Sequence, residues 1–228
     1  MPRTRRLIPL EAAMHIICRG NNRQDIFKRD QDKLCYYSLL RDLKEDNKIT
    51  IFHYCLMNNH LHLVIWLNSQ SKVSKFMKQV NLSYFSYYNK TYGYSGHLWQ
   101  GRFKSNIIDT EVYLMQCGRY IELNPVRAGI VKLPEEYRFS SYNYYARGIP
   151  DRIITTSPAY IGLADSSVQR RKQYIEFVTD NSIINSEKLI KNLFIGSQAF
   201  IKKLQDYYGI ENEGLKRGRP KRPEGPEK

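Results

Sequence analysis

Two histidines, His60 and His62, lie two residues apart in the apolar stretch 60–67, whose composition is typical of a strand. Side chains alternate along a strand, so both imidazoles project from the same face. Two imidazoles placed in this way can hold one divalent cation. The alternative is a histidine pair that only satisfies hydrogen bonds at the surface of a sheet.

Carboxylates are missing around this pair. No Asp or Glu occurs between Asp46 and Asp109. Because Mg²⁺ sites in proteins typically use Asp or Glu, any further protein ligand must come from elsewhere in the chain. Otherwise substrate phosphate and water would complete the shell of the metal.

Tyr120 and Asn124 are four residues apart, a spacing that places them on the same face of a helix. Pro125 cannot continue that helix, so we expect Asn124 at its C-terminus, where the partial negative charge favours a cation. The phenol of Tyr120, one helical turn before this amide oxygen, can approach a substrate group that the bound metal polarises. Alternatively, Tyr120 is one of 18 tyrosines and only packs.

Taken together, these residues and their neighbours resemble a known family, the HUH single-tyrosine transposases, and specifically the REP-associated tyrosine transposases of bacteria. The likeness extends over roughly residues 5–147, with the motifs in the family's order and spacing. The segments that carry it are Arg19–Arg23 (RGNNR), Met57–Val64 (MNNHLHLV), Leu98–Lys104 (LWQGRFK) and Arg119–Gly129 (RYIELNPVRAG).

The resemblance implies single-strand DNA cleavage and rejoining that needs Mg²⁺ or Mn²⁺ and no ATP. By the same resemblance, His60 and His62 are metal ligands, Asn124 is the third ligand and Tyr120 is the nucleophile. Other members of the superfamily carry Gln at the position of Asn124, and Asn has a shorter reach.

The expected chemistry is covalent catalysis at a phosphodiester. Its oxygens are already negative and repel nucleophiles, so a bound cation lowers the barrier. Attack by Tyr120 would form a 5′-phosphotyrosine bond, which a 3′-hydroxyl can later reverse. A nucleotide cofactor is not expected, because the sequence lacks a Gly-rich phosphate-binding loop with Lys. The substrate would be hairpin or palindromic single-stranded DNA.

The charge of the chain favours a nucleic-acid partner. The chain of 228 residues has 36 Lys and Arg against 22 Asp and Glu, a formal net charge of +14. Seven of these cations stand in the interval without carboxylates, and such a lasting positive field attracts phosphate backbones. A merely solubilising surface is the alternative.

Several residues are candidates for DNA contact. Within the motifs they are Arg19, Asn21, Asn22, Arg23, Arg102, Lys104 and Arg127. Arg102 and Lys104 are expected to alternate on one strand face. In the tail, Arg217 and Arg219 lie in an Arg-Gly-Arg-Pro core that resembles an AT-hook, which enters the narrow groove of A·T tracts. An ordinary turn, surface exposure and a generic basic tail are the respective alternatives.

The elements that must position these residues alternate between two periodicities. Strand patterns cover 14–19, 50–57, 60–67 and 102–108, with a hairpin turn at Asn58 and Asn59. Helical patterns cover 30–46, 74–90 and 110–123. This order predicts an α+β fold, a ferredoxin-like, mostly antiparallel sheet with helices on one face. Four aromatic residues of the second helical segment are expected in the core: Phe76, Tyr84, Tyr87 and Tyr88.

The predicted organisation has three parts. Residues 1–150 form the single-tyrosine transposase domain, 151–215 a helical extension with helices at 168–178, 186–193 and 197–208, and 216–228 a basic disordered tail. No apolar run is long enough to span a membrane, and the four separated cysteines predict neither disulfides nor a cysteine zinc site. We therefore expect a cytoplasmic, nucleoid-associated protein, monomeric or homodimeric.

Three functions remain open from the sequence. The first is a transposase that nicks and joins DNA. The second is a non-mobile DNA-binding or processing protein that acts on repetitive palindromes. The third is a metal-dependent phosphohydrolase that uses water and leaves no protein–DNA adduct.

Overall fold

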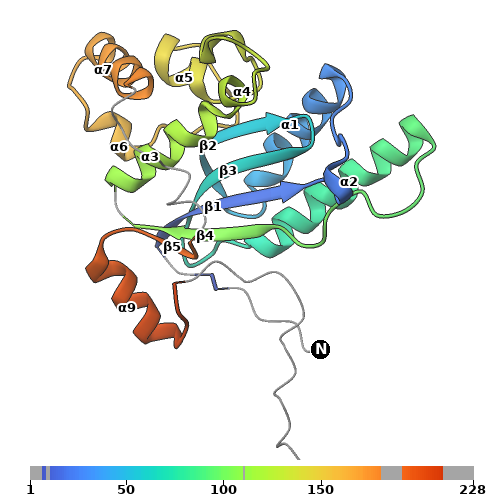
Figure 1. The fold of residues 1–228 in the computed structure, drawn as a ribbon, viewed down its shortest axis with the longest axis horizontal. Helices are drawn as coiled ribbons and strands as arrows, with labels where there is room; N and C mark the ends of the chain where they lie inside the picture. Colours follow the sequence, from blue (N-terminus) through green and yellow to red (C-terminus); the bar gives the residue numbers. More distant parts are fainter. Residues whose placement is uncertain (1–6, 9–10, 110, 181–191, 213–228) are drawn as a thin grey trace, which may run out of the picture.

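A five-stranded sheet forms the centre of the described part of the molecule (Figure 1). The computed structural model describes residues 7–8, 11–109, 111–180 and 192–212. The strand order is β2-β3-β1-β4-β5, antiparallel except for the parallel pair of β4 and β5. The strands are β1 (Ala12–Arg19), β2 (Thr50–Met57), β3 (His60–Leu67), β4 (Lys104–Ile108) and β5 (Phe194–Ile195). The predicted α+β fold with a mostly antiparallel sheet is confirmed.

Helices fill the gaps between and after these strands, and the three helical segments predicted before residue 124 are confirmed. Their bounds are α1 (Asp30–Lys44), α2 (Val73–Tyr92), α3 (Glu111–Glu122), α4 (Asn124–Arg127), α5 (Tyr142–Arg147), α6 (Pro158–Ile161), α7 (Ser167–Thr179) and α9 (Gln198–Tyr208). Two short 3₁₀ turns are η1 (Asn21–Arg23) and η2 (Pro134–Glu136).

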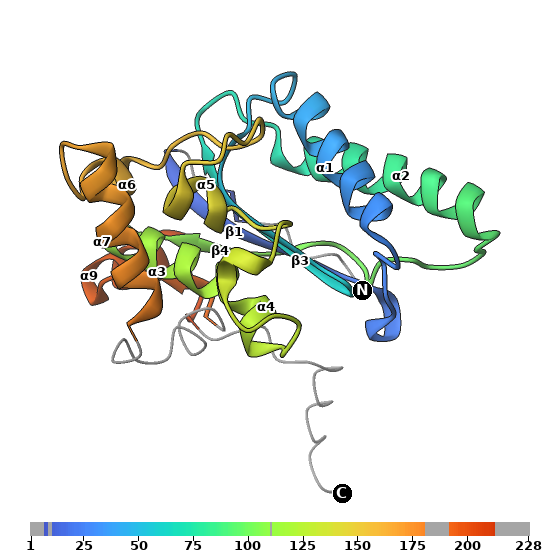
Figure 2. The same ribbon diagram turned by 90° about the horizontal axis from the view of Figure 1, so that it is seen from above.

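The helices cover both faces of the sheet, which corrects the expectation of helices on one face (Figure 2). The side chain of Asn81 in α2 contacts Cys18 on one face, and Tyr120 in α3 contacts His62 on the other. The reason is that the strands β2 and β3 are buried along almost their whole length. Such strands need apolar cover on both sides.

The β2–β3 hairpin turns at Asn58 and Asn59, as predicted. The Asn58 carbonyl accepts hydrogen bonds from the backbone of Ile26 and Phe27, so the hairpin tip is tied to the loop after β1. On the α1 and α2 side, Phe76, Tyr84 and other aromatic rings are buried, and Tyr87 is partly buried. The predicted core role of this aromatic set is confirmed.

Residues after 150 contact the sheet and its helices closely. Strand β5 adds to the edge of the sheet beside β4, and Tyr174 of α7 reaches the carboxylate of Glu122. The helices predicted at 168–178 and 197–208 correspond to α7 and α9. Most of the helix predicted at 186–193, and the whole tail with Arg217 and Arg219, lie outside the described residues.

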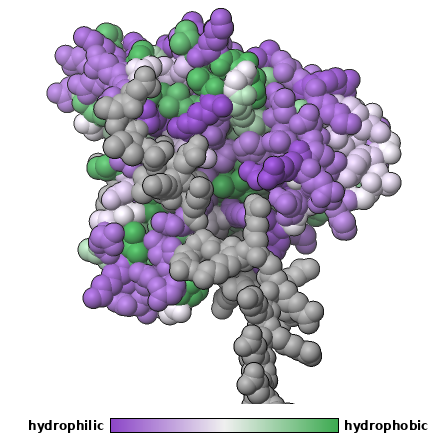
Figure 3. Space-filling view, viewed as in Figure 1, coloured by the Kyte–Doolittle hydropathy of each residue, from purple (hydrophilic) through white to green (hydrophobic). Residues whose placement is uncertain are grey.

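In the described part of the chain, none of the helices has the length and apolar character needed to cross a membrane. The face shown in Figure 3 is mostly hydrophilic, and its hydrophobic residues form small separate groups.

Candidate functional site

Backbone hydrogen bonds bring three of the sequence motifs to one end of the sheet. The amide of Gly20 donates to the Asn59 carbonyl at 2.9 Å, and the amide of Asn21 donates to the Leu98 carbonyl at 2.8 Å. Glycine is required at position 20, because a Cβ there would lie 2.3 Å from the Gln24 carbonyl oxygen. Segments far apart in the sequence thus surround the first residue of β3, His60.

His60 and His62 project from the same face of β3, as strand alternation predicts, with ring centroids 4.9 Å apart. The Nδ1 of His60 lies 2.6 Å from the Asn59 Oδ1, and the Nδ1 of His62 lies 2.8 Å from the Nε2 of His15. With the amide oxygen of Asn59 in this place as acceptor, His60 donates from Nδ1 and keeps a lone pair on Nε2. In each ring, therefore, Nε2 is the atom not used by these contacts.

Both histidines are held in the neutral form. Burial, with a smaller contribution from the charge of Arg19, lowers the pKa of His60 to about 4. Burial also lowers the pKa of His62 well below its ordinary value, followed by the effects of His15, His60 and Arg19. Desolvation disfavours the charged imidazolium, and a neutral imidazole is the form that binds a metal.

Tyr120 lies on the same side of the sheet as the histidine pair. Its ring centroid is 6.1 Å from that of His62, with the ring planes at 84°. The guanidinium carbon of Arg127 lies 4.6 Å from the centre of the Tyr120 ring, and its Nη1 donates to the Tyr120 carbonyl at 3.0 Å. Arg127 therefore holds both the ring and the backbone of Tyr120.

Asn124 is not at a free helix C-terminus, which corrects the expectation from the sequence. Helix α3 ends at Glu122, and Asn124 is the first residue of the short helix α4. Pro125 is tolerated there because the first turn of a helix does not use its amide hydrogens. Among the residues that the structure describes, the buried Asn124 Nδ2 has no hydrogen-bond partner. Because amide O and N are assigned by their contacts, the oxygen can occupy that place.

The close approach of α3 to the sheet depends on Gly118. A Cβ at this position would lie 2.6 Å from the Cε1 of His53, and no side chain can be accommodated at that distance. His53 itself is fully buried on β2. Gly118 is two residues before Tyr120, so this contact determines how near the phenol comes to the histidine pair.

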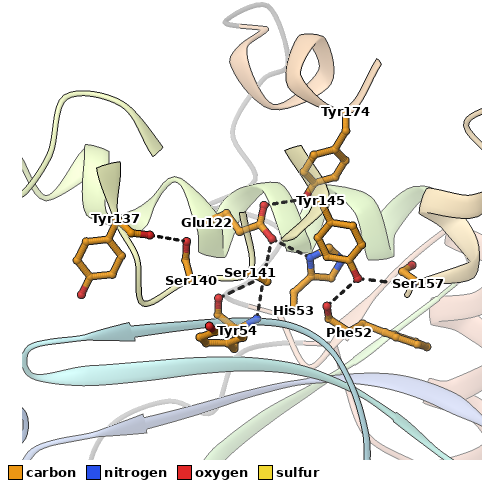
Figure 4. A network of polar contacts seen from close by, with 10 residues as sticks. All are labelled: Phe52, His53, Tyr54, Glu122, Tyr137, Ser140, Ser141, Tyr145, Ser157 and Tyr174. Atoms are coloured by element: carbon orange, nitrogen blue, oxygen red, sulfur yellow. Dashed lines mark hydrogen bonds and ion pairs between the residues drawn. The ribbon is translucent and has the colours of Figure 1, made fainter. Parts of the chain in front are cut away.

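A buried polar network fastens the C-terminal end of α3 (Figure 4). The Glu122 carboxylate accepts hydrogen bonds from His53 Nδ1 at 3.0 Å, Ser141 Oγ at 2.6 Å and Tyr174 OH at 2.6 Å. Burial first, and Glu122 second, raise the pKa of Tyr174 well above its ordinary value, so the phenol stays a donor. The network connects α3 to β2, to the loop before α5 and to α7.

Replacing Gly118 by Ala is expected to destabilise the protein by about 1–3 kcal/mol, because the new methyl group overlaps the fixed His53 ring. Thermal or urea unfolding measures this loss. The matched control is Gly162→Ala, where a Cβ would be 3.6 Å from its nearest neighbour, and the change should stay within about 0.5 kcal/mol. Equal stability of the two variants would contradict the close contact.

The predicted DNA-contact residues are distributed around the histidine pair in different ways. Arg19 pairs with His60, and Ile17 pairs with both His62 and Lys104, so Arg19 and Lys104 belong to the same sheet face as the site. Asn21 is half-buried, and Asn22 and Arg23 are exposed in η1. Arg102 is exposed but precedes β4, which corrects the prediction that it alternates with Lys104 on one strand. The loop at 101–103 bends before strand pairing begins.

The donor set fits a metal whose remaining ligands are oxygen atoms. Within the ranges that the structure describes, no group of three or more His, Cys, Asp or Glu side chains could hold an ion. Two neutral imidazoles with Nε2 turned away from their hydrogen bonds can donate nitrogen lone pairs to a divalent cation. An amide oxygen from Asn124, substrate phosphate and water are the donors left to complete the shell.

The sequence reasoning assigned no site role to His15 and Glu122. The ring of His15 contacts that of His62 directly. The alternation of β1 places His15 on the face of Arg19, but only the pairing of β1 with β3 brings it beside His62. Glu122 lies within the motif Arg119–Gly129. The apolar residues beside it on the helix are the signal in the sequence that its carboxylate is buried.

A comparison with protein families identifies the family of this chain. The family model described as "Transposase IS200 like" matches residues 10–124, half of the chain. This chain belongs to the IS200-like transposase family. The matched range contains the histidine pair, Tyr120 and Asn124, and ends at Asn124. Membership implies a transposase-like role in DNA processing. No curated protein matches the sequence.

Among solved structures, the chain is similar to a REP-associated tyrosine transposase solved bound to a REP hairpin. The TM-score is 0.55 at 19% identity, over 69% of this chain and 93% of the other. This likeness establishes the fold. A putative transposase from Deinococcus radiodurans is also similar, with a TM-score of 0.37 at 15% identity over 60% of this chain and 98% of the other.

Proposed function

We propose that this protein cleaves and rejoins single-stranded hairpin DNA through a covalent phosphotyrosine at Tyr120, with His60 and His62 as metal ligands. The observation that carries the proposal is the 6.1 Å separation between the rings of Tyr120 and His62 on one face of the sheet. Helix α3 and strand β3 are distant in the sequence, so their functional side chains meet only in the fold. Mg²⁺ or Mn²⁺ is the proposed ion.

A bound divalent cation would neutralise charge on the scissile phosphate and on the departing oxygen. The Tyr120 oxygen attacks phosphorus, the bond from phosphorus to the 3′-oxygen breaks, and a 5′-phosphotyrosine forms. The phenol loses its proton and the 3′-oxygen gains one, so the step is balanced. A 3′-hydroxyl reverses it, and no nucleotide is consumed.

Arg127, predicted to contact DNA, is proposed to hold Tyr120 for attack and to face the incoming phosphate. Replacing it by Met keeps an unbranched apolar side chain but removes the charge over the ring. We expect adduct formation at saturating DNA to slow by about 10- to 100-fold, because the cation–π contact and the nearby charge are lost. Single-turnover gel kinetics measure this rate. An unchanged rate with weaker DNA binding would leave Arg127 only a DNA contact.

The proposed DNA path runs along Arg19 and Lys104, which share the sheet face of the histidine pair. Arg23 in η1 is exposed at the same end of the sheet. Such phosphate contacts make affinity fall with rising salt. The similar solved structure is bound to a REP hairpin. A REP hairpin is therefore the first substrate to test.

One experiment distinguishes the proposal from its alternatives. The protein is incubated with 3′-labelled hairpin DNA and Mn²⁺, so that the label stays on the fragment that a 5′-phosphotyrosine retains, and the products are resolved on a denaturing gel. A protein–DNA adduct supports the proposal. Cleavage without an adduct supports a phosphohydrolase, and binding without cleavage supports a non-mobile regulator of palindromic repeats.

A further inference from the structure

Arg119 directly precedes Tyr120 in α3, but its guanidinium group is bound to α7. The residue is only 5% exposed. Its Nε donates to the backbone carbonyls of Phe177 and Val178 at 3.0 and 3.1 Å, and its Nη2 donates to the carbonyl of Asp180. A buried guanidinium with these partners is not available to a DNA phosphate. Its role therefore differs from that of an ordinary DNA-contact arginine.

The carbonyl groups that Arg119 binds lie at the C-terminal end of α7, where Asp180 follows the last helical residue. The last carbonyls of a helix have no partner inside the helix and carry the partial negative charge of its dipole. A guanidinium is planar and presents its N–H donors in fixed directions, so it can bind several of these oxygens at once. Arg119 thus joins α3 to α7 in a defined orientation.

A second attachment lies three residues further along α3. The hydroxyl group of Tyr174, also in α7, donates to the Glu122 Oε2 at 2.6 Å (Figure 4). Both residues are fully buried, and the Tyr174 ring packs against Tyr145 and Tyr160 with ring centroids 5.2 and 5.5 Å away. Helix α7 therefore binds α3 at residues on either side of Tyr120 in the sequence.

The two attachments fix the rotation of α3 about its axis. Successive residues of a helix are about 100° apart around the axis, so Tyr120 projects in a different direction from both Arg119 and Glu122. A rotation of about 20° would move a phenol oxygen that lies about 6 Å from the axis by about 2 Å. Misplacement of a reacting group by about 1 Å can reduce a rate by about 10²-fold. Small rotations of α3 would thus matter for the chemistry.

We propose that Arg119 and Tyr174 are positioning residues, through which α7 holds Tyr120 at the rotation of α3 that brings its ring beside His62. The inference rests on the proposed function of Tyr120 as the nucleophile. The family model matches residues 10–124 and so does not include α7. Membership of the family therefore does not by itself assign this role to α7.

The test measures the single-turnover rate of adduct formation at saturating 3′-labelled REP hairpin and Mn²⁺, in the full-length protein. In Arg119→Met we expect this rate to fall about 10- to 100-fold. Arg119→Lys keeps a cation at the end of α7 and should recover part of the rate. Tyr174→Phe should lower the rate less, by about 3- to 10-fold, because Glu122 keeps its contacts with His53 and Ser141.

Two further measurements separate positioning from binding. The affinities for the hairpin and for Mn²⁺ should equal those of the wild type in all three variants, because the substituted groups are buried between α3 and α7. Hydrogen exchange of the α3 backbone amides, measured without DNA and metal, should become faster in Arg119→Met and Tyr174→Phe. This exchange does not depend on the proposed chemistry.

The matched controls remove the same chemical groups where they bind other segments. The Nη1 of Arg170 donates to the carbonyls of Ala164 and Asp165 at 2.7 and 2.8 Å, and the hydroxyl group of Tyr160 donates to the Tyr145 carbonyl at 2.9 Å. Arg170→Met and Tyr160→Phe should therefore keep the wild-type rate of adduct formation and the wild-type exchange in α3.

Wild-type rates in both Arg119→Met and Tyr174→Phe, with an intact fold by circular dichroism, would overturn the inference even if both variants melted at a lower temperature. Weaker hairpin binding with an unchanged rate at saturation would also overturn it, because a DNA contact behaves in that way. If Arg119→Met does not fold, Arg119→Lys and Tyr174→Phe decide the question.

Failure of the proposed function would be seen separately. If the wild-type protein forms no adduct, or if Tyr120→Phe retains it, the assignment of the nucleophile is wrong. In that case hydrogen exchange still shows whether α7 holds α3. If the wild-type protein forms the adduct through Tyr120 and the α7 contacts leave its rate unchanged, only the positioning role fails.

Discussion

Replacement of Tyr120 by Phe is expected to abolish the covalent protein–DNA adduct, with a loss of cleavage of about 10⁴-fold or more. The substitution removes one oxygen atom and keeps the ring that packs beside His62 and under Arg127. Without a nucleophile, only binding and electrostatic effects remain to accelerate the reaction. Denaturing-gel analysis of labelled hairpin DNA in the presence of Mn²⁺ measures the effect.

The matched control is Tyr113→Phe, which removes a hydroxyl group from the same helix, about two turns earlier. Adduct formation in this variant should equal that of the wild type. Hairpin binding should be preserved in both variants, since neither loses a charge. A persistent adduct in Tyr120→Phe would exclude this residue as the nucleophile and direct the search to another tyrosine near the DNA.

The second large effect is expected at the histidine pair. His62→Ala should abolish measurable Mn²⁺ binding and reduce cleavage by about 10³-fold or more, because the charge stabilisation that a metal gives to a phosphoryl transfer is worth several kcal/mol. His60→Ala should act in the same direction. Removal of the metal with EDTA should reproduce the loss in the wild-type protein and change the variants little further.

His97→Ala is the matched control for these variants, because His97 is exposed in the loop before β4. It should retain metal binding and cleavage. If His62→Ala lost hairpin binding together with cleavage, a folding or DNA-contact role would explain the result better than metal ligation. Full cleavage in both His60→Ala and His62→Ala would contradict the metal centre.

Local pattern was sufficient to predict the elements that carry the site. Strand alternation placed His60 and His62 on one face, and Asn58 and Asn59 identified the hairpin turn, because both depend on the conformation of neighbouring residues. The three main helices followed from apolar spacing, with boundaries close to those observed. The roles of Tyr120, Asn124 and the histidines came from the resemblance and stay predictions.

Contacts between segments distant in the chain could not be predicted from local pattern. The cover on both faces of the sheet, the short strand β5 beside β4 and the buried contacts of Glu122 each join segments that are distant in the chain. Asn124 began a new helix instead of ending one because the position of Pro125 relative to the helix start, and not its presence alone, determines its effect.

The sequence by itself thus determined which side chains share a strand face or a helix face, since those relations depend on the backbone repeat alone. Only the tertiary structure decided that Gly118 lets α3 approach β2 closely enough to bring Tyr120 beside His62, and that strand register places His15 between His62 and Asn106. The physical reason is that such distances depend on packing between elements, where the absence of one Cβ or the register of one strand changes which atoms meet.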